Sequence, residues 1–469
     1  DVESRGLGDV YKRQLYMSYA VKNSEGAALM PSYIIRSMRK MFSHCLKLSY
    51  KDTAQQNSYV TIPRATNSFD NTEIVANVDE DIIDSLTGGR LVGSVTSFEN
   101  FAECPLRYYL RYGVDLKERE EFTFSPVNFG VVLHAVIREV CDEIKKNGES
   151  YYLISEEKRR EMVKRSVAAI TDIYQNSILK DSSRNSFMIK RMEDLADRTV
   201  WAMGEQLKCG DFVPFVFEHK FNMEVGDGDR KQLMSGTIDR VDICENGTDV
   251  YVRIIDYKTG KKDFNIVKTY YGIDIQLMVY MEAAMKLVAK MRPGKNVIPA
   301  GVFYYNISDP IVSATTESAE EIEDKIKGEL RLKGMVNSDK DIAEKMDNTG
   351  GTSLNIPVSR KADGGFDSRR SKVMNTEQFN MLGRFVDVRA VDTADRIAGG
   401  DIRRSPYKDG QFSSCDRCPY GAVCGFSVDL PGCNYRKLKK FDDEVLWNNI
   451  KEGVDENGKK MDTGAEERD

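Results

Sequence analysis

GTIDRVDI (residues 236–243) and RIIDYKTGKK (residues 253–262) are the segments that decide the fold of this chain. Each is predicted to form a β-strand, in which side chains two positions apart point to the same face of the sheet. Asp256 and Lys258 therefore share one face. Asp239 shares its face with the apolar residues that follow it, and an unpaired carboxylate on such a packed face is costly unless a cation meets it.

Two carboxylates that converge beside a lysine form a site of hard oxygen ligands, which suits Mg²⁺ or Mn²⁺. A metal there would hold a scissile phosphate and help to generate hydroxide, while Lys258 would orient the attacking water and offset developing charge. Asp256 and Lys258 alone are more often an ordinary charge pair at a strand end. The GxxD pattern that ends at Asp239 and the downstream QxxxY pattern, Gln276 to Tyr280, favour the catalytic interpretation.

The other candidate side chains lie on predicted helices. His134 is one of three histidines and borders an apolar helical stripe, where a histidine is usually a packing residue. Its functional role would be that of a metal ligand or a phosphate contact. Gln276 and Tyr280 lie four residues apart on one helix face and could contact the substrate or the catalytic lysine.

Patterning outside these segments predicts a chain in which helices and strands alternate. An aromatic-rich helix is expected with Ser97 as its N-cap, and a helix to about residue 398 with Asn375 and Gln378 as its capping box. The remaining predicted elements are a strand at 15–20, a helix from Pro31, a polar linker at 50–90, helices at 128–146, within 155–208 and at 273–290, strands at 212–221, 232–243, 249–260 and 297–306, and a charged, glycine-rich stretch at 308–372 with a loop at 361–372.

The composition bounds the class of protein. Of 469 residues, 41% are hydrophobic, and 68 basic against 74 acidic residues give a formal net charge of −6. The length suggests two or three domains, and the hydrophobic share is enough for a core. The charge balance argues against a wholly basic nucleic-acid binder but allows a locally basic groove. Without an apolar run long enough for a membrane span or a secretory leader, a cytoplasmic protein with no membrane partner is expected.

The nine cysteines include a cluster, CDRCPYGAVC, that carries Cys415, Cys418 and Cys424. In a chain without an export signal, such clustering indicates metal ligation rather than a disulfide framework. Cys104 lies far upstream in the predicted aromatic-rich helix. Four thiolates suit either Zn²⁺ or a [4Fe–4S] cluster. Cys433 falls near the cluster but outside its pattern, and the other cysteines are interpreted as buried small hydrophobic residues: Cys45, Cys141, Cys209 and Cys244.

Four motifs in order resemble the RecB branch of the PD-(D/E)XK nucleases: GxxxH (Gly130–His134), GxxD (Gly236–Asp239), DxK (Asp256–Lys258) and QxxxY (Gln276–Tyr280). The resemblance covers roughly residues 91–440. It implies an α/β restriction-endonuclease-like core, with a mixed central sheet flanked by helices, and Mg²⁺-dependent phosphodiester hydrolysis.

The same resemblance implies a role for each matched residue. His134, Asp239 and Asp256 would ligate the metal, and Lys258 would be the catalytic lysine, with Gln276 and Tyr280 completing the catalytic set. Glu218, on the preceding strand, is a weaker candidate and is more readily a surface strand charge.

One distant cysteine before the nuclease motifs and three after them resemble the iron–sulfur staple of RecB-like nucleases. This resemblance favours a [4Fe–4S] cluster held by Cys104, Cys415, Cys418 and Cys424 and closing the nuclease domain.

Residues 15–42 and the long insert within the nuclease region resemble the B-subunit family of bacterial AddAB helicase–nucleases. That implies a heterodimer with the larger helicase–nuclease partner of that complex, acting on single-stranded DNA ends in double-strand-break repair and recombination, with 5′-to-3′ cleavage. No GxxxxGK[ST] phosphate loop occurs in the sequence, so the ATP-binding part is expected upstream.

The predicted domain layout has four parts. Residues 1–14 are interpreted as a non-native artefact, because the string DVYKRQ (residues 9–14) can be back-translated into the end of a common sequencing adapter. After them come a helicase-like remnant with a linker (15–90), the nuclease domain (91–440) and a polar tail (441–469). Three alternatives remain: a stand-alone CRISPR-associated nuclease of the same superfamily, a binding module with a decayed nuclease fold, and a zinc-stabilised DNA-binding scaffold without catalysis.

Overall fold

A computed structural model describes residues 77–79, 92–117, 126–173, 183–225, 232–313, 318–428 and 433–466. All of them belong to one compact unit, residues 73–469. The expected artefact at 1–14, the strand at 15–20 and the helix from Pro31 lie outside the described residues, as do nearly all of the expected linker and Cys45.

The centre of the fold is a mixed sheet, as the resemblance implies, and it has seven strands. Its strands are β1 (Val92–Ser94), β2 (Val213–Val225), β3 (Gln232–Asn246), β4 (Asp249–Lys258), β5 (Asn296–Asn306), β6 (Lys333–Asn337) and β7 (Val373–Met374). β2 pairs antiparallel with one edge of β3. The other edge of β3 pairs with β1 in parallel and with β4 antiparallel, and β5, β6 and β7 continue the sheet beyond β4.

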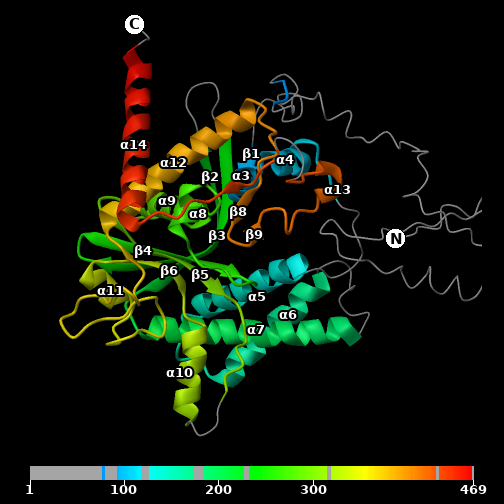
Figure 1. The fold of residues 1–469 in the computed structure, drawn as a ribbon. Helices are drawn as coiled ribbons and strands as arrows, with labels where there is room; N and C mark the ends of the chain where they lie inside the picture. Colours follow the sequence, from blue (N-terminus) through cyan, green and yellow to red (C-terminus); the bar gives the residue numbers. More distant parts are fainter. Residues whose placement is uncertain are drawn as a thin grey trace, which may run out of the picture. The chain divides into compact units, whose positions relative to one another are not determined.

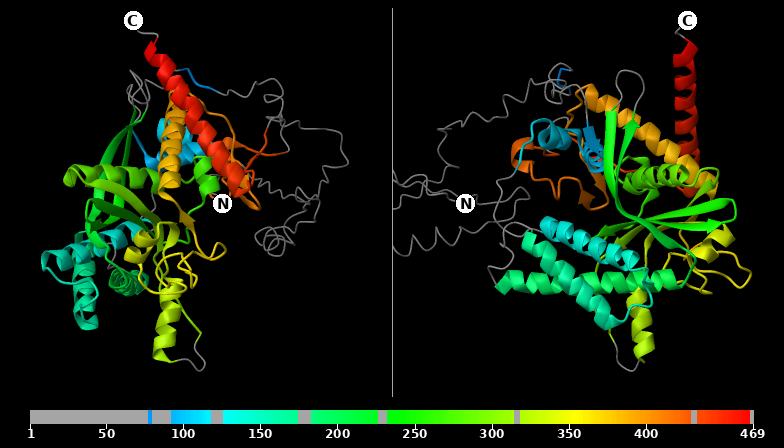
Figure 2. Two further views of the ribbon diagram at one scale, coloured as in Figure 1. Left: turned by 90° about the vertical axis from the view of Figure 1, so that its left-hand side faces the viewer. Right: turned by 180° about the vertical axis from the view of Figure 1, so that it is seen from behind.

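Helices cover both faces of this sheet (Figures 1 and 2). On one face, α5 (Pro126–Lys146), α6 (Glu156–Ile173) and α7 (Ser183–Lys208) share a core with the strands. On the other face, a second core joins α3 (Val95–Glu103), α9 (Gln276–Met291), α12 (Thr376–Ala398) and α14 (Asp443–Glu466) to the sheet. The predicted apolar stripe of α5, from Leu133 to Ile144, is fully buried in the first core.

The period of two along β4 decides which face the predicted site occupies. Tyr251, Ile255 and Tyr257 point into the core of α5 to α7. Val252 and Ile254, on the alternate positions, point into the core of α9 and α12. Asp256 and Lys258 continue that second series, so both reach the face that α9 covers.

A buried ion triad ties β3 to β4 on the opposite face. Asp242 receives hydrogen bonds from Arg240, at 2.7 and 2.6 Å, and from Arg253, at 2.8 Å. All three side chains are essentially inaccessible to solvent. Burial acts to raise the pKa of Asp242, but the two guanidinium groups outweigh it, so the carboxyl pKa is lowered.

Several elements differ from the sequence-based prediction. The N-cap of α3 is Ser94, whose hydroxyl accepts from Ser97 N–H, so the assignment of the cap to Ser97 was wrong. α10 (Ala319–Glu329), β6 and α11 (Lys340–Met346) occupy the stretch expected only to be charged and glycine-rich. The expected polar tail contains α14, whose Leu446 and Ile450 enter the core beside α12.

The shorter elements lie mostly around the two ends of the nuclease region. They are α4 (Pro105–Tyr108), a π-helix (Tyr109–Gly113), α8 (Ile266–Tyr270), β8 (Tyr407–Asp409), β9 (Phe412–Ser413), α13 (Gly421–Cys424) and β10 (Arg436–Lys437), of which β8, β9 and β10 form a small separate sheet. The capping box at Asn375 and Gln378 begins α12 as predicted. Among the described helices, none has the length and apolar character that a membrane span requires.

Candidate active site

Asp239 lies where β3 changes partner. β1 pairs with β3 up to Ser235, and β4 pairs with β3 from Arg240 onward. Between the two ladders, Asp239 Oδ2 accepts a hydrogen bond of 2.7 Å from the backbone N–H of Tyr257. The carboxylate therefore takes the place of a strand partner, and it lies across from Asp256, the neighbour of Tyr257 on β4.

Three ligand groups converge at this position. His134 Nδ1, from α5, lies 3.4 Å from Asp239 Oδ2 and 3.9 Å from Glu218 Oε1. One ligand atom from each of these three residues lies within 4.8 Å of the other two. Burial alone would lower the pKa of His134, but its hydrogen bond to Asp239 and the surrounding carboxylates raise it overall.

Glu218 belongs to this group, and the expectation that it is a surface strand charge was wrong. Its side chain is 22% exposed. Its backbone has φ of +48°, in the left-handed region that non-glycine residues rarely adopt. Glu218 stands opposite Asp239 on the neighbouring strand, and burial and the charge of Asp239 raise its pKa.

The structure links four of the sequence-predicted residues into one chain of polar contacts. Lys258 Nζ lies 2.6 Å from Asp256 Oδ2 and donates to Gln276 Oε1 at 2.9 Å. Gln276 Nε2 in turn donates to the hydroxyl of Tyr280 at 2.9 Å. Gln276 and Tyr280 lie on the first turns of α9, so this helix fixes the direction of the lysine side chain.

The charge balance of the site favours a cation. Burial and the charge of Asp239 raise the pKa of Asp256 to about 6, although Lys258 opposes this shift. Asp239, Asp256 and Glu218 thus lie close together with one lysine. Repulsion between their negative charges makes it unfavourable for all of them to be ionised at once. Oxygen and imidazole ligands in this arrangement fit a divalent cation, which would relieve that repulsion.

A second polar cluster lies beside the first and was not predicted. Glu99 Oε1 accepts from the backbone N–H groups of Ile275 and Gln276, at 2.9 and 3.0 Å. Burial raises the pKa of Glu99 to about 7, against the opposing charge of Lys262. Asp274 completes the cluster. Two features of the sequence could have indicated this cluster: Asp274 lies just before the QxxxY motif, and Lys262 lies just after the DxK motif.

Cys104 comes near the other three cysteines of the predicted cluster although it lies far upstream of them in the chain. Cys104 lies between α3 and α4, Cys415 and Cys418 lie after β9, and Cys424 ends α13. Burial, as the largest cause, and the charges of the other three thiols raise the pKa of Cys415.

Hydrogen bonds hold the two segments that carry these cysteines against each other. Leu106 N–H donates to Arg403 O at 3.3 Å, and the Tyr420 hydroxyl donates to Leu116 O at 2.9 Å. Arg436 also donates to the carbonyl of Ala102. The cysteine-bearing segments therefore pack directly on each other.

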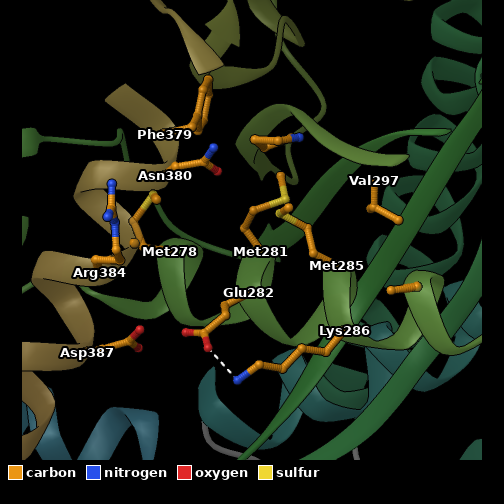
Figure 3. A pocket seen from close by; sticks show the side chains of 13 residues that line it. Met278, Met281, Glu282, Met285, Lys286, Val297, Phe379, Asn380, Arg384 and Asp387 are labelled. Atoms are coloured by element: carbon orange, nitrogen blue, oxygen red, sulfur yellow. Dashed lines mark hydrogen bonds and ion pairs between the residues drawn. The ribbon is translucent and has the colours of Figure 1, made fainter. Parts of the chain in front are cut away.

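A groove of about 400 Å³ between α9 and α12 is separate from this site. Figure 3 shows its methionine lining, Met278, Met281 and Met285, and the ion pair of Glu282 with Lys286 at its rim. At 100° per residue, these methionines lie on the face of α9 opposite Gln276 and Tyr280. None of its lining residues belongs to the two polar clusters.

Comparison with known proteins gives one family and a set of relatives. The family model described as the PD-(D/E)XK nuclease superfamily matches residues 93–425. A protein of Thermoanaerobacter sp. (strain X514), named as the B subunit of an ATP-dependent helicase/deoxyribonuclease, is 30% identical over 96% of this chain and 44% of its own length. Proteins with the same name from Caldanaerobacter subterraneus subsp. tengcongensis and Lachnoclostridium phytofermentans are 31% and 33% identical, over 97% and 83% of this chain.

The chain spans less than half the length of these relatives, between 34% and 44%. The resemblances inferred from the motifs, to the nuclease superfamily and to helicase–nuclease B subunits, are confirmed.

The two motif glycines should respond differently to alanine. A Cβ on Gly236 would lie 2.7 Å from the ring of Phe221 and 3.0 Å from that of Tyr280, whereas a Cβ on Gly130 would meet only Thr259, at 3.6 Å. We expect Gly236→Ala to destabilise the protein by about 1–3 kcal/mol and Gly130→Ala, in a helix, to be neutral or stabilising by up to about 1 kcal/mol. Thermal unfolding followed by circular dichroism measures both; a Gly236→Ala variant that melts above Gly130→Ala would contradict this expectation.

Proposed function

This chain belongs to the PD-(D/E)XK nuclease superfamily, and we propose from this premise that it is a Mg²⁺-dependent deoxyribonuclease that cuts single-stranded DNA ends. The observation that carries the proposal is the convergence of Asp239 and Asp256, from the paired strands β3 and β4, beside Lys258. A divalent cation held by His134, Asp239 and Asp256, with Glu218 as a further ligand, would polarise the phosphate and lower the pKa of bound water.

The protein's own side chains then have separate roles. Lys258 donates to a phosphate oxygen or to the attacking water and offsets the charge that develops in the transition state. Gln276, held by Tyr280, keeps the ammonium group of Lys258 directed at that position. Asp239 keeps its geometry through the N–H of Tyr257. Burial and the charge of Asp239 raise the pKa of Asp256 to about 6, and a bound cation would offset this shift.

Replacing either residue of the DxK motif should abolish cleavage without unfolding the protein. We expect Asp256→Ala and Lys258→Ala to reduce Mg²⁺-dependent cleavage of single-stranded DNA at least 100-fold, because each change removes a group at the reacting centre. Single-turnover kinetics measure this. The matched control is Lys286→Ala, which removes an exposed lysine at the rim of the separate methionine groove. Cleavage within tenfold of the parent, about 1.4 kcal/mol, would remove the altered residue from the mechanism.

We further propose that Cys104, Cys415, Cys418 and Cys424 hold a [4Fe–4S] cluster. The thiols influence one another's charge, which supports a shared site. Four thiolates suit either Zn²⁺ or a [4Fe–4S] cluster. The resemblance of the cysteine order to the iron–sulfur staple of RecB-like nucleases favours the cluster.

Loss of one cluster ligand should destabilise the whole nuclease domain. Because the cluster would link segments from the two ends of the domain, it constrains the unfolded chain like a long-loop disulfide, by on the order of 5 kcal/mol, and its binding energy is also folding energy. We expect Cys104→Ala to lose the visible absorbance of the cluster and to lower the melting temperature by at least about 5 °C.

Cys433→Ala is the control, because Cys433 is buried nearby but is not one of the four proposed ligands, and it should keep the absorbance. Stoichiometric zinc without iron in anaerobically purified protein would contradict the cluster. Full retention of metal in Cys104→Ala would contradict the link between the two segments.

The relatives support a wider proposal about assembly. We propose that residues 91–440 form the nuclease domain and residues 15–90 the end of a helicase-like region, with residues 1–14 non-native and a helical segment after residue 440. The whole protein would pair with a larger helicase–nuclease partner in the cytoplasm and degrade DNA ends in the 5′-to-3′ direction during break repair. The names of the relatives, as B subunits of a helicase/deoxyribonuclease, support this assignment.

A further inference from the structure

A second lysine lies beside the reaction centre and has no role in the proposed mechanism. Lys262 lies in the loop that follows β4, shortly after Lys258, the last residue of that strand. Its Nζ lies 3.0 Å from Asp274 Oδ1 and 4.6 Å from the centre of the Tyr304 ring. The Tyr304 hydroxyl donates to the same oxygen of Asp274 at 2.7 Å. Because Tyr304 pairs with Asp256 across β5 and β4, this arrangement sits directly beside the metal-binding acids.

The backbone of Lys262 is fixed by a reciprocal pair of hydrogen bonds. Lys262 N–H donates to Asn306 Oδ1, and Asn306 Nδ2 donates to Lys262 O, each at 3.0 Å. Asn306 is the last residue of β5, so the loop is attached to the sheet at this point. A lysine whose backbone and counter-ion are already in place loses less conformational freedom when it binds a ligand.

The two lysines are partly exposed, whereas the carboxylates with which they pair are buried. Lys258 Nζ lies 5.6 Å and Lys262 Nζ 4.6 Å from the centre of the same tyrosine ring. The lysine side chains are 27% and 32% exposed, whereas their partners Asp256 and Asp274 are 3% and 5% exposed. The lysine side chains are therefore the more accessible charged groups of the two pairs, and an ammonium group suits an anion.

The charge of Lys262 is secured by its surroundings. Burial alone would lower its pKa, but Asp274 and Glu99 raise it overall. Glu99 is itself held by the first N–H groups of α9. The acidic neighbours thus keep Lys262 cationic although most of its side chain is covered.

We propose that Lys262 binds the phosphate next to the scissile phosphate of a DNA strand, with Asp274 and Tyr304 as positioning residues. This inference rests on the proposed nuclease function. A DNA strand presents a phosphate at every nucleotide, and lysine contacts to phosphates fix the register of a protein on the strand. With Lys258 at the scissile phosphate, Lys262 sets which bond lies over the metal site.

The test compares Lys262→Met, which keeps the stem and removes the charge, with Lys262→Arg in the full 469-residue chain. The substrate is a short single-stranded oligodeoxynucleotide. For Lys262→Met we expect KM to rise about tenfold with kcat within about threefold of the parent. The plot of log KM against log salt should become shallower by about 0.7, the value for one phosphate contact on a single strand. Lys262→Arg should keep both parent values.

Lys262→Gln retains a hydrogen-bond donor toward Asp274 and gives the same readout if the methionine variant does not fold. Lys286→Met controls for general loss of surface charge. A Lys262→Met or Lys262→Gln variant with the parent KM and salt slope would overturn the proposal, as would a fall confined to kcat, which indicates only a structural role beside Lys258. If the parent chain does not cleave DNA, the nuclease proposal fails instead, and fluorescence anisotropy with the same oligodeoxynucleotide still tests Lys262 through affinity and salt slope.

Discussion

The hydrogen bond from the N–H of Tyr257 to the carboxylate of Asp239 is the contact on which the site depends. It occupies the stretch of β3 between its ladder with β1 and its ladder with β4. The Asp239 carboxylate accepts from the Tyr257 N–H, which in a continuous ladder would donate to a backbone carbonyl of the neighbouring strand. The bond aligns Asp239 with Asp256, and His134 and Glu218 approach the same carboxylate from α5 and β2. One interaction therefore sets both the local sheet geometry and the arrangement of the proposed metal ligands.

The two faces of β3 and β4 show how partner number decides the state of a buried acid. Asp242 is buried between two guanidinium groups, and its pKa is lowered. Asp256 is equally buried but has one lysine and a neighbouring carboxylate, and its pKa rises to about 6. The first arrangement is complete and locks the strands together. The second lacks positive charge, which a bound divalent cation would supply.

Local pattern was sufficient to predict much of this molecule. The period of two in β3 and β4, the apolar stripe of α5 and the capping box of α12 are short-range signals, and the structure contains each of them. Glu218 was only a weaker candidate in the sequence, because the direction of its side chain depends on its left-handed backbone within β2. Glu99 could not be predicted, since it contacts residues that lie 176 and 177 positions away. α10 was missed because it has no buried residue, although its capping box at Ser318 and Glu321 was readable.

The measurement that tests the central claim most directly is Mn²⁺ binding by isothermal titration calorimetry, in the parent chain and in Asp239→Asn. Asparagine can still accept the hydrogen bond from Tyr257, so the strand geometry is kept while the charge is lost. We predict that the parent binds Mn²⁺ and that Asp239→Asn binds at least tenfold more weakly, with an unchanged melting temperature of the metal-free protein. Equal Mn²⁺ affinity in the two proteins would contradict the role of Asp239 as the shared anchor of the sheet and the metal.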